Sequence, residues 1–394
     1  ATGERCALRP VAKPAFSIDL EVFEAQSLTG QLHRDAHGVD DRLYEGTMIH
    51  RDTRLRGMLM TDGVGQVSAM QVAWANALGV YVRVDCEQQI FGYAYVSCSG
   101  NVRDLSGHMH HISRAPMATS LDLSDTNLQD DDVASLVREN PYYEELYLDR
   151  NGITDAGMAH LTMLTNLRVL SLRGNNISDA GVAHLAGLTA LQNLNVEDTD
   201  VSYRGLGIVA RLPNLRKLAI SNVSPRGLAR LRGMPRLEWL IISADARHLE
   251  LAELTSLPAL RGLDLTLQGL RKRDELTLGS LTALQRLSLH VTSGCGKSLA
   301  GEISKLSQLR SLALTCYLLA DADMAPIATL AHLTALRIDG ERVTDIGLAH
   351  LAALPQLRTL DISGLGAGVL TADGIGYLAK AAKLEIIEVV NRMR

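Results

Sequence analysis

Residues 166–190 read NLRVLSLRGNNISDAGVAHLAGLTA, and this stretch decides the fold. Leu167, Leu170 and Leu172 are spaced as L-x-x-L-x-L, which predicts a short strand with its leucines on one side. After a polar turn, residues 179–188 carry apolar side chains at helical spacing. Neither element can bury its apolar side alone, so the stretch predicts a strand–turn–helix unit that is stable only when neighbouring units stack on it.

The same unit recurs along the chain with a regular period. Placing the second leucine of each strand in register gives twelve copies, separated by 22 to 27 residues. The aligned positions are Leu121, Leu146, Leu170, Leu194, Leu218, Leu240, Leu263, Leu287, Leu312, Leu336, Leu360 and Ile387. These copies predict an α/β fold: a right-handed solenoid of twelve repeats over residues 118–394, with a parallel β-sheet on its concave face.

Residues 1–117 precede the repeats and predict a small α/β domain. Helical spacing predicts helices over 18–28 and 67–78. Residues 80–84 and 90–96 are rich in Val, Tyr and Phe, which predicts a β-hairpin. The apolar end of a first repeat needs a cover, so this domain is either a cap or an independent module.

Composition excludes some functions and favours others. The net charge of −5 and the pI near 6.2 argue against a nucleic-acid partner. No apolar run reaches the length that spans a membrane. The five cysteines lack paired spacing, which favours reduced thiols. Reduced thiols are typical of the cytoplasm, or of a host cytosol for a secreted effector.

The period and the helix segments carry a resemblance to a known family. Residues 179–186, DAGVAHLA, and the 24-residue spacing resemble the leucine-rich-repeat superfamily, in particular its ribonuclease-inhibitor-like class and the GALA-type repeats of bacterial effectors. Those effectors join the repeats to an F-box that recruits a ubiquitin ligase. Residues 1–115 show no Leu-Pro opening and no run of three amphipathic helices. The resemblance implies protein–protein interaction and, in an effector, a role in virulence.

Catalytic chemistry has few candidates in this sequence. A nucleophilic thiol needs a neighbouring base or positive charge. Cys98 ends a predicted strand, and His108 or His110 is the candidate base, although packing is the commoner role of such a cysteine. His110 and His111 are adjacent and would face apart on a strand, and no further ligand motif accompanies them. We therefore expect no metal site and no cofactor.

The predicted concave face supplies the candidate binding surface. In an L-x-x-L-x-L strand the residues between the leucines point away from the core. This rule selects Glu145, Tyr147, Asp149, Arg173, Glu197, Trp239, Arg286, Arg337, Asp339 and Asp361 as partner-binding residues. A tryptophan on a solvated face is costly unless something covers it, and aromatic anchors dominate binding energies. The acidic first third and Trp239 predict a protein partner with a basic, partly apolar patch.

These features favour a scaffold that binds a macromolecular partner on the concave face, which for an effector is a host protein. The alternative is an enzyme whose N-terminal domain modifies a protein recruited by the repeats, for example in ubiquitin signalling. A purely structural or oligomer-forming array is a third interpretation. The last strand, residues 384–390, is apolar and only four residues follow it, which predicts self-association through this end or a longer parent chain.

Overall fold

The computed structural model describes residues 119–270, 276–292, 299–362, 371–379, 381 and 383–388, together with the backbone of five strands between residues 43 and 98. The predicted helices over 18–28 and 67–78 lie outside these residues. The chain divides into two compact units, Ala1–Val201 and Ser202–Arg394.

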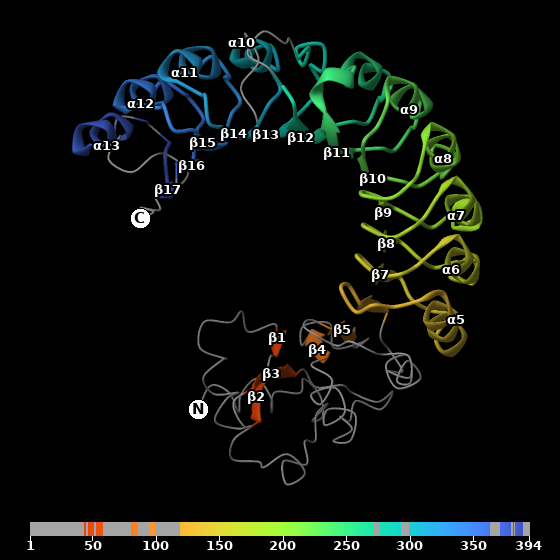
Figure 1. Cartoon of the computed structure of the whole chain (residues 1–394). Helices are drawn as coiled ribbons and strands as arrows, with labels where there is room; N and C mark the ends of the chain where they lie inside the picture. The colour runs from red at the N-terminus through yellow and green to blue at the C-terminus, as the bar shows by residue number, and fades with distance from the viewer. Residues whose placement is uncertain are drawn as a thin grey trace. The chain divides into compact units, whose positions relative to one another are not determined.

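In the first unit, short parallel strands alternate with helices, and the strands and helices form two layers (Figure 1). The strands are β6 (Ser120–Asp122), β7 (Glu145–Tyr147), β8 (Val169–Ser171) and β9 (Asn193–Asn195), and they pair in chain order. The helices are α5 (Asp130–Glu139), α6 (Asp155–His160), α7 (Asp179–Ala183) and the 3-10 turns η2 (Leu161–Met163) and η3 (His184–Gly187). Leu121, Leu146, Leu170 and Leu194 are register partners and at most 2% exposed, which confirms the alignment of these repeats.

A β-hairpin precedes the first repeat, as the sequence predicted. Strand β4 (Val80–Asp85) pairs antiparallel with β5 (Ala94–Cys98), and β5 pairs in parallel with β6. The remaining strands are β1 (Leu43–Tyr44), which pairs with β4, and the antiparallel pair β2 (Gly46–His50) and β3 (Thr53–Gly57). The hairpin therefore pairs with the outer edge of β6, and the choice between a cap and an independent module stays a prediction.

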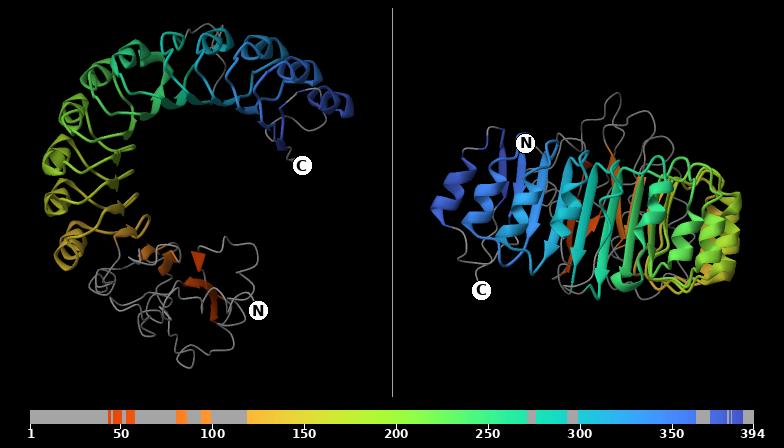
Figure 2. Two further views of the ribbon diagram at one scale, coloured as in Figure 1. Left: turned by 180° about the vertical axis from the view of Figure 1, so that it is seen from behind. Right: turned by 90° about the horizontal axis from the view of Figure 1, so that it is seen from above.

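The second unit repeats the same two-layer arrangement over eight parallel strands (Figure 2). The strands are β10 (Lys217–Ser221), β11 (Trp239–Asp245), β12 (Gly262–Gln268), β13 (Arg286–Val291), β14 (Ser311–Cys316), β15 (Ala335–Asp339), β16 (Thr359–Asp361) and β17 (Ile386–Glu388). The helices are α8 (Tyr203–Val209), α9 (Pro225–Arg230), η4 (Ala246–His248), η5 (Leu251–Ser256), α10 (Leu299–Ser304), α11 (Asp321–Ile327), α12 (Asp345–Leu351) and α13 (Ala372–Leu378). The register from Leu218 to Ile387 matches the sequence alignment at every strand pair.

Asparagines close the turns of the regular repeats, where Asn175 is buried and Asn151 is partly buried. The Nδ2 of Asn151 donates to the carbonyls of Leu123 and Leu148 at 2.9 and 3.0 Å, and its Oδ1 accepts from Leu128 N–H at 2.9 Å. Asn175 likewise donates to the carbonyls of two adjacent repeats. These asparagines therefore hold the loop backbone at the turn. Each one also ties its own repeat to the preceding one.

The middle repeats of the second unit satisfy their backbone differently. Strands β11 and β12 are seven residues long, and their pairing continues to Asp245 and Gln268, which occupy the asparagine position. The extended strand pairing therefore replaces the asparagine hydrogen bonds. The helical side is also altered here, because η4 and η5 stand where other repeats carry an α-helix.

An aspartate–glycine interlock joins the helical sides of consecutive repeats. In each case the aspartate accepts a backbone N–H at 2.7–3.0 Å and a hydroxyl at 2.5–2.7 Å from the residue just before the next helix. The pairs are Asp130–Thr154, Asp155–Ser178, Asp321–Thr344 and Asp345–Thr371. The glycine of the next D-x-G motif leaves room for this carboxylate: a Cβ on Gly347 would stand 2.6 Å from Asp321 Oδ1. The repeated motif is thus explained by stacking geometry.

The interlock makes a prediction about pH. Burial alone would raise the pKa of Asp155, but hydrogen bonds from Ser178 and Gly181 bring it below its ordinary value. A carboxyl with a lowered pKa stabilises the fold above its unfolded pKa of about 3.9, and this contribution is lost as the pH falls through the folded pKa. We expect the urea midpoint of Asp155→Asn to fall less than that of the wild type between pH 7 and pH 3. An equal decrease of the urea midpoint in both proteins would show that Asp155 does not cause this dependence of stability on pH.

The last strand leaves apolar side chains exposed. Ile386 and Ile387 of this strand are 50% and 39% exposed, and self-association through this end stays a prediction.

Cys316 is buried and disulfide-bonded, which corrects the expectation of reduced thiols. The scattered spacing of the cysteines in the sequence does not reveal a pairing that the fold creates. The other cysteines have no described side chains. Among the described residues, no helix has the length and apolar character needed to cross a membrane.

Candidate binding surface

The candidate binding surface is the strand face, defined here as the side chains of the parallel strands that alternate with the buried ladder leucines. The helices cover the opposite side of the strands in each unit (Figure 1). The strand faces of the two units differ in their charge.

In the first unit the strand face is acidic around Tyr147. Burial, followed by the charges of Glu145 and Asp122, raises the pKa of Tyr147 to about 12. Glu145 also accepts a hydrogen bond from Ser120 Oγ at 2.9 Å. The structure therefore brings Glu145 and Tyr147 together, as the strand alternation predicted, in a field of negative charge.

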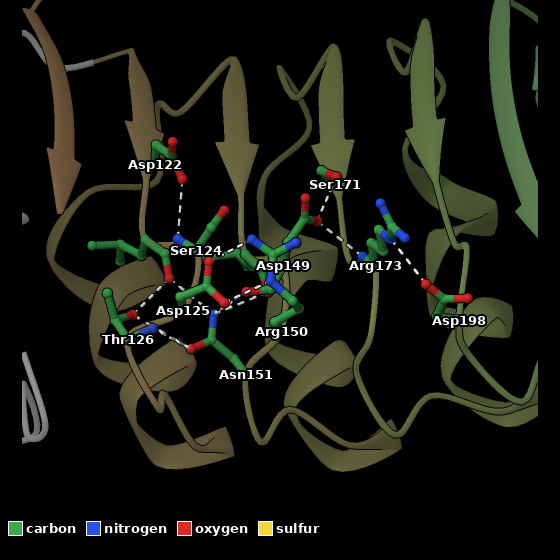
Figure 3. A network of polar contacts seen from close by, with 12 residues as sticks. Asp122, Ser124, Asp125, Thr126, Asp149, Arg150, Asn151, Ser171, Arg173 and Asp198 are labelled. Carbon is green, nitrogen blue, oxygen red and sulfur yellow. Dashed lines mark hydrogen bonds and ion pairs between the residues drawn. The ribbon is translucent and has the colours of Figure 1, made fainter. Parts of the chain in front are cut away.

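Asp149 and Arg173 serve partly as internal braces at the ends of these strands (Figure 3). The Oδ1 of Asp149 accepts the backbone N–H of Arg173 at 2.9 Å and the hydroxyl of Ser171. Arg173 Nε donates to Asp198 at 2.9 Å. The sequence places both residues on the strand face, but it does not show that each already has a partner in the next repeat.

Gly174 explains why Arg173 reaches Asp198. Asp125, Arg150, Gly174 and Asp198 occupy the same turn position of successive repeats, and all four have positive φ. Arg150 forms an ion pair with Asp125 in the preceding repeat (Figure 3). Gly174 has no side chain and so cannot pair with Asp198 of the next repeat. The adjacent residue, Arg173, pairs with Asp198 instead.

Glu197 corrects the sequence expectation of an exposed side chain, because it is only 8% exposed. Arg173 occupies the equivalent position of the preceding repeat. Asp198 first, and Glu197 after it, raise the pKa of the Arg173 guanidinium, so the two acidic groups lie close to one cation. Glu197 thus offers little surface to a partner.

In the second unit, Trp239 lies flat on the neighbouring strand. Gly262 is its register partner, and a Cβ there would stand 2.6 Å from Trp239 Cδ2. The indole Nε1–H donates to Asp264 Oδ2 at 2.8 Å. The ring is therefore fixed in place by a glycine below it and a carboxylate at its edge, and it stays partly exposed.

Two cations flank the Trp239 ring. Lys217 Nζ lies 5.8 Å and Arg286 Cζ lies 5.5 Å from the ring centroid. Lys217 occupies the equivalent position one strand before Trp239, and Arg286 occupies it two strands after. Within the described part of the chain, neither cation is in an ion pair with a carboxylate. We call Lys217, Trp239, Gly262, Asp264 and Arg286 the Trp239 cluster.

Asp264 has an unusual environment within the Trp239 cluster. Burial raises its pKa, and the hydrogen bond from Trp239 and the charge of Lys217 oppose that rise only in part. A half-buried carboxylate that holds an indole N–H is a positioning group, since it fixes the direction of the ring.

The later candidates are arranged as a separate charged patch. Arg337 and Asp361 are register partners, and Arg337 Nε lies 3.4 Å from Asp361 Oδ2. Asp339 is partly exposed at the end of β15. In the Arg337–Asp361 pair the two charges neutralise each other, so the pair contributes less net charge to the strand face than the sequence suggested.

Sequence reasoning missed Gly262 and Asp264. A signal was available, because the repeat period places Gly262 beside Trp239, and a glycine inside a strand marks close approach of another group. Of the catalytic candidates, Cys98 has a described backbone only, and His108 and His110 lie outside the described residues. Their proposed chemistry stays a prediction.

Comparison with known proteins places this surface in context. A family model described as a leucine-rich repeat region matches residues 145–386, more than half of the 394-residue chain. Among solved structures, an internalin from Listeria monocytogenes is 21% identical, with a TM-score of 0.47 over 75% of this chain and 80% of that chain. A leucine-rich-repeat protein from Leptospira interrogans is 17% identical, with a TM-score of 0.36 over 70% and 80%. The plant peptide hormone receptor RGFR1 in complex with RGF2 is 15% identical, with a TM-score of 0.34 over 71% and 48%. None of the curated proteins matches the sequence.

Proposed function

This chain belongs to the leucine-rich repeat family, and on that premise we propose that it is a protein-interaction scaffold whose strand face binds a protein partner, with Trp239 as the anchor. A more specific version of this proposal is that the protein is a bacterial effector that binds a host protein. This version rests on the resemblance of the repeats to GALA-type effectors.

The observation that carries the proposal is the Trp239 cluster. A rigid aromatic ring costs little conformational entropy to bind, and such rings are the commonest anchors of protein interfaces. Gly262 and Asp264 hold the Trp239 ring before any partner arrives. The fold itself does not need an indole at this position, because the equivalent position holds Lys217 one strand before, Gly262 one strand after and Arg286 two strands after.

The charges refine the chemistry of the partner. Around Tyr147 the acidic strand face suits a basic group, as the sequence predicted. Around Trp239 the flanking groups are cations, so the segment that covers this ring carries a carboxylate beside an apolar side chain. We therefore expect a basic group on a partner at Tyr147 in the first unit, and an acidic and apolar segment on a partner at Trp239 in the second unit.

A capture experiment tests the proposal. Full-length wild type, Trp239→Ala and Tyr317→Ala are immobilised, and bound proteins are identified by mass spectrometry. Tyr317 is a matched control, since it is an aromatic residue of the same unit that is 50% exposed and lies in a turn after β14. We expect a protein that is captured by wild type and Tyr317→Ala and is lost with Trp239→Ala. A partner retained equally by all three proteins would place the binding surface elsewhere.

A further inference from the structure

A second polar cluster lies on the helical side of the second unit, around Tyr203 at the start of α8. Arg204 Cζ and Arg230 Cζ each lie 5.8 Å from the centroid of the Tyr203 ring. Arg204 and Arg226 are the second residues of α8 and α9, so they occupy equivalent positions of adjacent repeats. We call Tyr203, Arg204, Arg226 and Arg230 the Tyr203 cluster.

The cluster lies within a segment that has no internal counter-charge. Between Asp200 and Glu238 the sequence holds seven arginines, one lysine and no carboxylate, in a chain whose net charge is −5. The interlock explains part of this imbalance, because Tyr203 and Pro225 stand where other helices begin with an aspartate. Two stacking carboxylates are therefore missing from these repeats.

Some of these arginines are neutralised from outside the segment. Arg216 pairs with Glu238 at 3.1 Å, and Arg232 pairs with Glu253 at 2.5 Å. Arg226 and Arg230 have no ion pair with any carboxylate in the described residues, and both side chains are exposed. Arg211, Arg236 and Lys217 likewise have no ion pair in the described residues, but these three do not lie against the Tyr203 ring.

Two arginines of the cluster converge on the Tyr203 ring, since Arg204 and Arg230 belong to helices of adjacent repeats and each lies over that ring. The hydrogen bond and charge of Arg204, and then the charges of Arg226 and Arg230, lower the pKa of Tyr203. The aliphatic stem of Arg230 passes over Gly207, where a Cβ would lie 3.7 Å from Arg230 Cδ. A guanidinium stacked on an aromatic face still has its in-plane N–H groups available to an anion.

We propose that the Tyr203 cluster is a docking site for a phosphorylated segment of a partner protein. A phosphate monoester carries about −1.5 to −2 charges and three acceptor oxygens, so it can engage several converging guanidinium groups at once. A carboxylate carries one negative charge and two acceptor oxygens, fewer of each than a phosphate monoester. The number and convergence of the arginines therefore favour phosphate over an acidic side chain.

Other anionic partners fit the cluster less well. A single-stranded nucleic acid needs aromatic faces on which bases stack, whereas the Tyr203 ring already has two guanidinium groups over it at cation–π distance. A membrane-binding surface carries apolar groups that insert between lipids. No large hydrophobic side chain of residues 202–240 is among the exposed ones of the described chain.

The test uses the full chain and one synthetic probe, a fluorescein-labelled peptide Ala-Gly-Ser-Gly-Ala with a phosphorylated serine. Its unphosphorylated form and a form with Glu in place of Ser are the reference probes. Fluorescence anisotropy measures binding to wild type, to Arg226→Gln/Arg230→Gln and to Arg211→Gln/Arg236→Gln. The last variant is matched, because it removes two arginines from the same segment that do not act on Tyr203. Circular dichroism checks the fold of each variant.

We expect wild type to bind the phosphopeptide at least about 10-fold more tightly than either reference probe. Arg226→Gln/Arg230→Gln should lose about 10-fold in affinity, and Arg211→Gln/Arg236→Gln less than about 2-fold, since long-range charge is screened by salt. Equal losses in the two variants would overturn the proposal, as would equal binding of the Glu peptide. A 12-nucleotide single strand that binds more tightly than the phosphopeptide, with the same dependence on Arg226 and Arg230, would also overturn it in favour of nucleic acid.

Discussion

Leu170→Ala is expected to lower the free energy of unfolding by about 2–5 kcal/mol. Leu170 is 1% exposed and is the register partner of Leu146 and Leu194 in adjacent repeats. Truncation leaves a cavity between the sheet and the helices that a stacked ladder cannot close, because each repeat is held by both neighbours. Urea denaturation followed by circular dichroism measures the change.

Val169→Ala is the control for this substitution, since Val169 lies on the same strand but faces away from the core and is only partly buried. We expect the control to cost under about 1 kcal/mol. If Val169→Ala destabilises the protein more than Leu170→Ala does, the register is shifted by one residue and the strand face is assigned to the wrong side.

Trp239→Ala is expected to weaken partner binding by about 2 kcal/mol or more, which is roughly a 30-fold rise in Kd. The ring loses its contact with the partner, and Lys217 and Arg286 lose the surface that holds them in place. Isothermal titration calorimetry with the captured partner measures the change. Thermal melting of the free protein shows whether the fold is intact.

The matched variant for this prediction is Asp264→Asn. The asparagine side-chain oxygen can still accept the indole N–H, so the ring keeps its orientation while a charge is removed. We expect less than about a 5-fold change in Kd for Asp264→Asn. A larger loss for Asp264→Asn than for Trp239→Ala would make the carboxylate, rather than the ring, the main contact.

The strand register was predictable from the sequence because one position of every repeat holds a large aliphatic side chain, leucine in eleven of them and Ile387 in the last. The period alone fixes which residues are neighbours, from Leu121 to Leu194 and from Leu218 to Ile387. The length of β11 and β12 could not be predicted from the sequence. The absence of an asparagine at the turn position indicates that the turn is changed, but it does not indicate that the strand continues.

The strand-face residues could be placed, but their partners could not. Asp149 and Arg173 point the way the alternation requires, yet both contact the next repeat. For Arg173 the reason lies in the turn at Gly174, which the alternation does not show. Trp239 was identifiable as exceptional from its residue type. Its support by Gly262 and Asp264 needed two positions 23 and 25 residues away to be considered together.

Tryptophan fluorescence tests strand-face binding most directly. The chain has two tryptophans, so Trp74→Phe leaves Trp239 as the single emitter, and Trp74→Phe/Trp239→Phe provides the blank that removes the partner's own emission. The captured partner is titrated into both proteins. Our account predicts that the emission of Trp239 shifts to shorter wavelength as the partner saturates, because the bound segment removes water from the indole. Saturation of binding with an unchanged emission spectrum of Trp239 would contradict it.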